Sequence, residues 1–344
     1  MARVNFFNTN SALIETPKGP QYGGVSAWQG IRYLGSNIYL ICGTTNPNPN
    51  AGYGLIYIGN INCINGIFYY LNIPNNVGVA TSVYGPNYDL NTGIYTFVGS
   101  YTDYKHKTKG FIYNGTLDKN NLKNPNNFSY PSVNSSYTTT FLHSNMNGLI
   151  VGNSGDKKNT ISYIYDINNL SKIKTQIKFP DSKTTTTYGI WYNGKNLYTL
   201  VGGYSSNFIP IETINLANGV IKPIGNAFIV DYNSKTNTFC NWTTINYQES
   251  DTNFITHFEG IYGNEDGSYS INANVSSVDN FIPQGYFLTI SRNNNNKFVS
   301  NSKNWIKLNY NKHGITSSNS VANNKVVGLF IGKQNISYQC EIIF

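Results

Sequence analysis

Charged residues, long apolar runs and helical patterns are all scarce in this chain of 344 residues. Only 12% of the residues are charged, and no window repeats apolar residues at the 3.6-residue spacing of an amphipathic helix. No apolar run is long enough to span a bilayer, and the first twenty residues lack the apolar core of an ordinary signal peptide. The sequence therefore predicts a soluble protein without a transmembrane segment. Its compartment stays open between the cytoplasm, a virion and an unconventional export route.

Arginine is also rare, although the formal net charge is +8. The lysines are spread along the chain, and the arginines are Arg3, Arg32 and Arg292 alone. Phosphate recognition normally needs clustered cations, so no nucleic-acid partner is expected. A diffuse basic surface suits solubility or weak attraction to acidic surfaces.

Motifs for metals, cofactors and nucleophiles are missing as well. The four cysteines show no CxxC or other metal-ligand spacing, and no GxSxG, P-loop or helix-opening GxGxxG occurs. No metal and no cofactor is predicted. We expect Cys42, Cys63, Cys240 and Cys340 to be buried, reduced thiols, with a bridge between Cys42 and Cys63 left open for an exported protein.

What the chain does contain are residues of strands and turns. It has 28 Tyr, 18 Phe and 32 Gly, a composition that favours an all-β fold. Four segments align as β-hairpins with a tight polar turn: IRYLGSNIYLICGTTN from Ile31, YDLNTGIYTFVGSYTD from Tyr88, WYNGKNLYTLVGGYSS from Trp191 and IYGNEDGSYSINANVSS from Ile261. A third and a fourth apolar strand follow each hairpin. Four antiparallel strands in roughly 50 to 60 residues is the period of a propeller blade.

The two ends of the chain predict how the fold closes. The last repeat supplies three strands and ends with ISYQCEIIF from Ile336, whereas ARVNFFNTN from Ala2 precedes the first repeat and resembles a fourth strand. Pairing these two segments would close a ring. The sequence thus predicts a six-bladed β-propeller with four-stranded blades, and a β-sandwich or a solenoid is the alternative. The predicted blades cover residues 22–75, 78–134, 136–181, 183–248, 252–310 and 313–344 together with 1–10.

Candidate site residues come from the innermost strand of each predicted blade, because these strands line the central channel of a propeller. The strands are VSAWQG from Val25, ATSVYG from Ala80, TTTFLHS from Thr138, TTTTYG from Thr184, ITHFEG from Ile255 and ITSSNS from Ile315. Aligning them on the residue before the glycine places Gln29, Tyr84, Tyr188 and Glu259 in one ring, and His143 and Asn319 are assigned to it from the two strands that lack this glycine. Such a ring could hydrogen-bond a sugar or another polar ligand.

His257 joins this set because it lies two residues before Glu259 and shares its face of the strand. The pair could contact a ligand or perform acid–base chemistry, or it could simply satisfy its own hydrogen bonds. Glycoside hydrolysis usually needs two carboxylates, and Glu259 is the one carboxylate in the six strands. Sialidases also use an arginine cluster and Asp-box repeats, which this chain lacks.

The phrases YGIWYNGKNLYTLVGGYS from Tyr188 and THFEGIYG from Thr256 resemble repeats of uncharacterised bacterial and viral propeller-like proteins. That resemblance implies a fold and no activity. Tyrosine and asparagine suit recognition surfaces, so the sequence favours a non-enzymatic binding or scaffold module for a glycan or a protein surface. The alternatives are a structural component of a virion or extracellular assembly, and a hydrolase or lyase that uses Glu259 and His257. The oligomeric state stays open.

Overall fold

The computed structural model describes residues 2–8, 26–48, 51–62, 66–74, 78–131, 133, 137–156, 160–206, 225–248, 253–280, 282–300, 304–332 and 335–344. Over these residues the fold is all-β, and the 3-10 helices Asn121–Lys123 and Pro125–Asn127 are single turns. None of the helices in the described ranges is long and apolar enough to cross a membrane. Cys63 and the predicted start of the first repeat at residues 22–25 lie outside the described residues.

The described strands fall into six groups in chain order, and consecutive strands of a group pair antiparallel. The first three groups are group 1, with β2 (Ser26–Gly35), β3 (Ile38–Asn48), β4 (Ala51–Asn60) and β5 (Ile67–Leu71); group 2, with β6 (Gly78–Asp89), β7 (Ile94–Asp103), β8 (Thr108–Gly115) and β9 (Phe128–Ser129); and group 3, with β10 (Thr139–Met146), β11 (Leu149–Gly155), β12 (Thr160–Asp166) and β13 (Thr175–Ile177).

The later groups repeat this order with two variations. They are group 4, with β14 (Thr184–Gly194), β15 (Leu197–Ser205), β16 (Asn226–Asn233) and β17 (Thr238–Thr244); group 5, with β18 (Phe254–Gly263), β19 (Tyr269–Ser277), β20 (Gln284–Arg292), β21 (Phe298–Ser300) and β22 (Ile306–Lys307); and group 6, with β23 (Ile315–Ala322), β24 (Lys325–Ile331), β25 (Asn335–Ile343) and β1 (Arg3–Asn8). In group 5 both short outer strands pair with β20. In group 6 the outer strand comes from the start of the chain.

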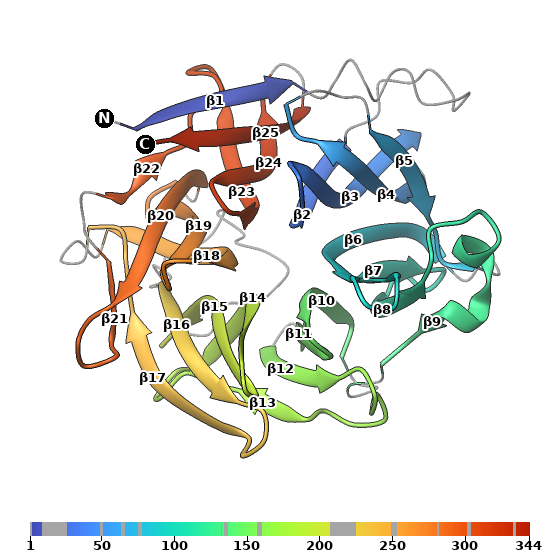
Figure 1. The fold of residues 1–344 in the computed structure, drawn as a ribbon, viewed down its shortest axis with the longest axis horizontal. Helices are drawn as coiled ribbons and strands as arrows, with labels where there is room; N and C mark the ends of the chain where they lie inside the picture. The colour runs from blue at the N-terminus through green and yellow to red at the C-terminus, as the bar shows by residue number, and fades with distance from the viewer. Residues whose placement is uncertain are drawn as a thin grey trace.

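The groups surround a central axis in a propeller-like ring, and the first strand of each group is the innermost (Figure 1). Each inner strand contacts the inner strand of the next group, and β23 contacts β2. The ring of inner strands is therefore continuous, and all six groups can place side chains near the axis.

Strand β1 closes the ring as the sequence predicted. It pairs antiparallel with β25 from Arg3 opposite Ile343 to Asn8 opposite Tyr338, which places the two ends of the chain side by side (Figure 1). Val4 and Phe6 pack against the apolar cluster that contains Cys340. Burial of such side chains is what holds an edge strand in register.

The core lies between neighbouring groups rather than inside one sheet. Ile56 of β4 and Phe97 of β7 belong to one buried cluster, so groups 1 and 2 share it. Val201 of β15 and Leu288 of β20 join groups 4 and 5 in the same way. Because each apolar sheet face is covered by the next group, the inner strands are held at fixed positions around the axis.

The outer strands differ most from the sequence prediction. β9 has two residues and β13 has three, and the outer edge of group 5 is divided between β21 and β22. An outer strand has a neighbour on one side only, so its pairing is the weakest in the sheet. The prediction of buried thiols holds for Cys42 and Cys340 but is wrong for Cys240, which is exposed because it lies on the outer strand β17.

Candidate functional site

One β-bulge recurs at the same place in all six inner strands. At this shared place the pairing with the neighbouring strand skips one residue, so that two residues of the inner strand face one partner position. The skipped residues are the ring residues that the sequence alignment selected: Gln29, Tyr84, His143, Tyr188, Glu259 and Asn319. A bulge bends the strand and redirects its side chain, which explains how a regular sheet presents one side chain per group to the axis.

A small residue follows each ring residue because neighbouring inner strands approach closely there. A Cβ atom built on Gly30 would lie 2.0 Å from the backbone oxygen of Tyr84 in the next group. A Cβ on Gly85 would lie 2.8 Å from the backbone oxygen of His143. The glycine that follows a ring residue is therefore required because neighbouring inner strands leave no room for a side chain there.

The ring residues converge on one cavity of about 240 Å³. Six of the seven predicted site residues line it, namely Gln29, Tyr84, His143, Tyr188, Glu259 and Asn319. His257 stands beside the cavity and contacts three of the residues that line it, namely Thr186, Tyr188 and Glu259. The volume is below the range of roughly 300 to 1,000 Å³ typical of sites for drug-sized ligands, so the cavity suits a ligand of about one ring.

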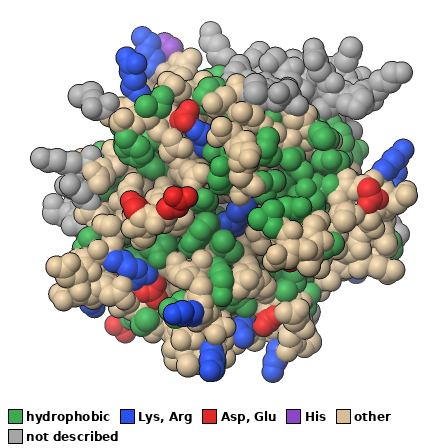
Figure 2. All heavy atoms as spheres, in the orientation of Figure 1, with side chains coloured by type: hydrophobic (Ala, Val, Ile, Leu, Met, Phe, Trp, Pro, Cys, Tyr) green, Lys and Arg blue, Asp and Glu red, His purple; other side chains and the backbone are tan. Residues whose placement is uncertain are grey.

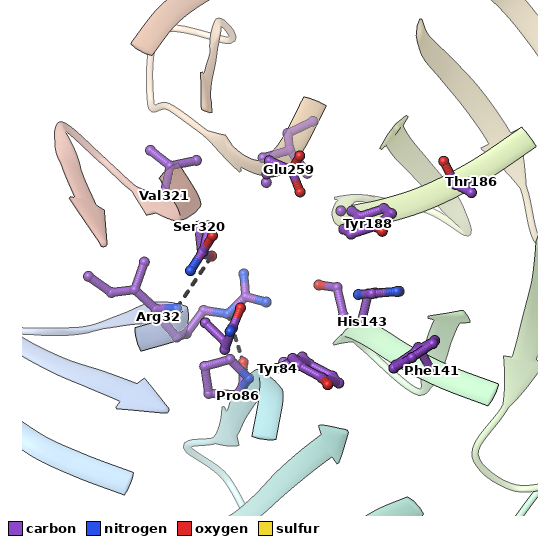
Figure 3. A pocket seen from close by; sticks show the side chains of 18 of the residues that line it. Arg32, Tyr84, Pro86, Phe141, His143, Thr186, Tyr188, Glu259, Ser320 and Val321 are labelled. Atoms are coloured by element: carbon purple, nitrogen blue, oxygen red, sulfur yellow. Dashed lines mark hydrogen bonds between the residues drawn. The ribbon is translucent and has the colours of Figure 1, made fainter. Parts of the chain in front are cut away.

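One wall of the cavity is aromatic. The imidazole of His143 is stacked on Tyr188, with 3.9 Å between the ring centroids, and Tyr84 lies 5.5 Å from His143 on the other side. Phe141 extends this wall, 6.0 Å from His143 (Figure 3). The Tyr84 hydroxyl is fixed by Ser100 Oγ at 2.9 Å. Stacked rings of this kind present a flat face with polar edges, which suits the C–H face of a sugar or another planar group.

Burial keeps the aromatic wall uncharged. Desolvation lowers the pKa of His143 to about 3, with a smaller contribution from His257. Desolvation also raises the pKa of Tyr84 and of Tyr188, and nearby Glu259 adds to the shift at Tyr188. The wall is therefore neutral at physiological pH.

The opposite wall is polar and comes from groups 5, 6 and 1. Glu259, Ser320 and Arg32 lie across the cavity from Tyr84, His143 and Phe141 (Figure 3). Asn319 donates from Nδ2 to the backbone oxygen of Trp28 at 2.7 Å, so its amide also ties group 6 to group 1.

His257 is oriented by residues of two groups. Its Nε2 lies 2.8 Å from Thr186 Oγ1, and its ring meets Tyr188 edge-on at 4.6 Å. Its Nδ1 lies 3.2 Å from Glu259 Oε1, which is close enough for an ion pair but out of line for a hydrogen bond, so Nδ1 has no hydrogen-bond partner among the described residues. The imidazole fits because Gly203 carries no side chain, since a Cβ there would lie 2.3 Å from His257 Cδ2.

Arg32 is the cavity residue that sequence reasoning missed. It follows Gln29 by three residues on β2, and its side chain runs towards the middle of the cavity (Figure 3). Figure 2 shows a basic side chain near the centre of this face, with hydrophobic side chains gathered beside it over the region of β2 to β7. Arg32 is the only lysine or arginine among the described residues that line the cavity.

The described residues hold no cluster of three His, Cys, Asp or Glu side chains that could bind a metal ion. Glu259 is likewise the only carboxylate among the described residues that line the cavity.

Comparison with known proteins supports the fold. No family model matches the chain, and no curated protein matches it by sequence. A sialidase from Trypanosoma rangeli is similar in structure, with a TM-score of 0.52 and 7% identity over 92% of this chain and 55% of the sialidase. At that identity the likeness shows the fold alone, which is propeller-like.

Two further structures are more distant. A hypothetical protein from Leishmania major has a TM-score of 0.42 and 12% identity, over 85% of this chain and 98% of that protein. The β-propeller domain of the trilobed protease from Pyrococcus furiosus has a TM-score of 0.41 and 10% identity, over 90% of this chain and 80% of that domain.

Proposed function

We propose that this chain is a closed six-bladed β-propeller that serves as a binding module and holds a small glycan in its central cavity. The observation that carries the proposal is the recurrence of one bulge in six inner strands, which brings six side chains around one cavity. Groups 1 to 6 are then its blades, and β1 completes the sixth.

The chemistry of the two walls supports a sugar ligand. The stack of Tyr84, His143 and Tyr188 offers a neutral flat face, on which an apolar sugar face can lie. Gln29 and Glu259 offer polar side-chain atoms that hydroxyl groups can pair with. Because the ring positions are set by bulges packed between blades, the site is largely formed before a ligand arrives, which reduces the entropic cost of binding.

A glycan array followed by calorimetric titration of the hits tests this proposal. We expect at least one glycan to bind, and Tyr188→Ala to weaken its binding by roughly tenfold or more, since stacking and apolar contact at a buried ring contribute about 1.5 kcal/mol or more. Tyr104→Ala is the matched control, because Tyr104 is 63% exposed and does not line the cavity. A protein pull-down should run in parallel, and capture of a protein whose binding survives Tyr188→Ala would contradict a channel site for a glycan.

An enzymatic role is the second candidate, because Glu259 lines the cavity beside His257. In that case Glu259 would act as an acid or base on a bound sugar and His257 would orient it. Turnover of the glycans that bind, abolished by Glu259→Gln, would favour a hydrolase or lyase over a pure binding module. Binding without turnover would favour the module.

A further inference from the structure

Arg32 is an enclosed cation with no acidic partner among the described residues. Its Nε donates to the backbone oxygen of Pro86 at 3.3 Å, and one terminal nitrogen donates to the backbone oxygen of Asn145 at 3.2 Å. The other terminal nitrogen lies 4.0 Å from the sulfur of Met146. The guanidinium also lies 5.7 Å from the centre of the Trp191 ring.

These neighbours are all neutral, so they orient the guanidinium without cancelling its charge. A guanidinium has five N–H groups, and the three contacts above use one on each nitrogen, which leaves two for a ligand. Desolvation lowers the pKa of Arg32 from its ordinary value to about 10, yet the group stays charged at neutral pH. Arg32 is half-buried, so its charge is partly desolvated without a counter-ion, and a bound anion would offset part of that cost.

Arg292 differs from Arg32 because its guanidinium is paired with a carboxylate of the protein itself. Arg292 of β20 makes two hydrogen bonds with the carboxylate of Asp231 on β16, at 2.9 and 2.7 Å. No such carboxylate faces Arg32 in the described part of the chain, and the residue instead lines the cavity. Glu259 is the carboxylate among the described residues that line the cavity, but it lies within ion-pair distance of His257.

We propose that the ligand of this cavity carries a carboxylate that pairs with Arg32, and that its ring lies against Tyr84, His143 and Tyr188. This inference rests on the proposed glycan-binding function and names its substrate class, an acidic monosaccharide unit such as a uronate. A carboxylate matches the planar fork of an arginine, and its two oxygens can take the two remaining N–H groups. Glu259 also lines the cavity, so a ligand carboxylate is expected to lie away from it and against Arg32, which leaves Glu259 to accept from hydroxyl groups.

The test compares matched acidic and neutral probes by calorimetric titration. Glucuronate and galacturonate are the acidic probes, and the corresponding uronamides are neutral molecules of nearly the same shape. We expect at least one uronate to bind the wild-type protein about 30-fold or more tightly than its amide, as for loss of one partner of an enclosed charge pair. Arg32→Gln should remove that preference, whereas Arg3→Gln should keep it, because Arg3 lies on the exposed side of β1.

The comparison on the wild-type protein decides the matter even if Arg32→Gln does not fold. Equal binding of a uronate and its amide, or an unchanged preference in a folded Arg32→Gln variant, would overturn the inference. Binding of neutral glycans alone would overturn the inference that the ligand carries a carboxylate, but it would leave the proposed glycan-binding function standing. Absence of binding by every uronate and every neutral glycan would remove both.

Discussion

The imidazole of His143 and the phenol ring of Tyr188 are stacked across two neighbouring blades, with centroids 3.9 Å apart and planes inclined by 25°. Each residue is the bulged residue of its inner strand. The stack is thus set by the spacing of groups 3 and 4, and it forms a neutral surface on the cavity. Its neutrality is itself a measurable property of the fold.

We expect His143 to make the protein less stable in mild acid. The unfolded chain takes up a proton at this residue below about pH 6.5, while the folded protein does so near pH 3, so stability falls as pH decreases through this window. Between pH 7 and pH 5 the loss due to His143 should reach up to about 2 kcal/mol. Urea denaturation of the wild type and of His143→Phe, which keeps an aromatic ring, measures it. Equal losses in the two proteins would show that His143 is not held neutral.

The ion pair of Arg292 and Asp231 should be a major link between blades 4 and 5. Both side chains are largely buried, and the guanidinium also lies 4.0 Å from the centre of the Phe298 ring. Arg292→Met should lower the free energy of unfolding by about 3 kcal/mol, because it leaves the Asp231 charge without its counter-ion. Adding Asp231→Asn should restore part of the loss. Lys109→Met is the control, since Lys109 pairs with Asp103 at a side chain that is 51% exposed and should matter little.

If β1 closes the ring, truncation of a single side chain on β1 should lower the stability of the protein. Phe6 has its ring centroid 5.3 Å from those of Tyr310 and Tyr338. Phe6→Ala should reduce the free energy of unfolding by about 2 to 3 kcal/mol, because it empties part of that cluster. Asn5→Ala, at the exposed neighbouring position, should leave the thermal midpoint unchanged. Removal of residues 2–8 should destabilise the whole fold, and an unchanged midpoint there would refute closure by this strand.

The close approach of inner strands predicts a penalty for any side chain at Gly30. A Cβ at this position meets the backbone oxygen of Tyr84 at 2.0 Å, so Gly30→Ala must push blades 1 and 2 apart. We expect a loss of about 2 kcal/mol and weaker binding in the cavity. Ser144 occupies the equivalent position in blade 3, so Ser144→Ala should be tolerated. Similar melting curves for the two variants would contradict tight packing at the bulge.

Part of the site was readable from the sequence because a bulge leaves a local signature. The bulged residue precedes a glycine in four inner strands, so alignment on that glycine found Gln29, Tyr84, Tyr188 and Glu259. A serine stands there in the other two strands, and His143 and Asn319 were assigned without the glycine. The position of His257 was also local, since it lies two residues before Glu259. Its contacts were not, because Thr186 and Gly203 belong to the preceding blade.

The repeat pattern and the strand order were determined by the sequence alone, because turn residues and alternating apolar residues act over short distances along the chain. The use of β1 to complete the last sheet followed from the strand count, since the last repeat supplies three strands and an extra strand precedes the first repeat. The surroundings of Arg32 were decided only by the tertiary structure. Its hydrogen-bond partners Pro86 and Asn145 lie 54 and 113 residues away. Whether a charge has a counter-ion depends on which carboxylates the ring brings within a few ångströms, and no local pattern on β2 carries that information.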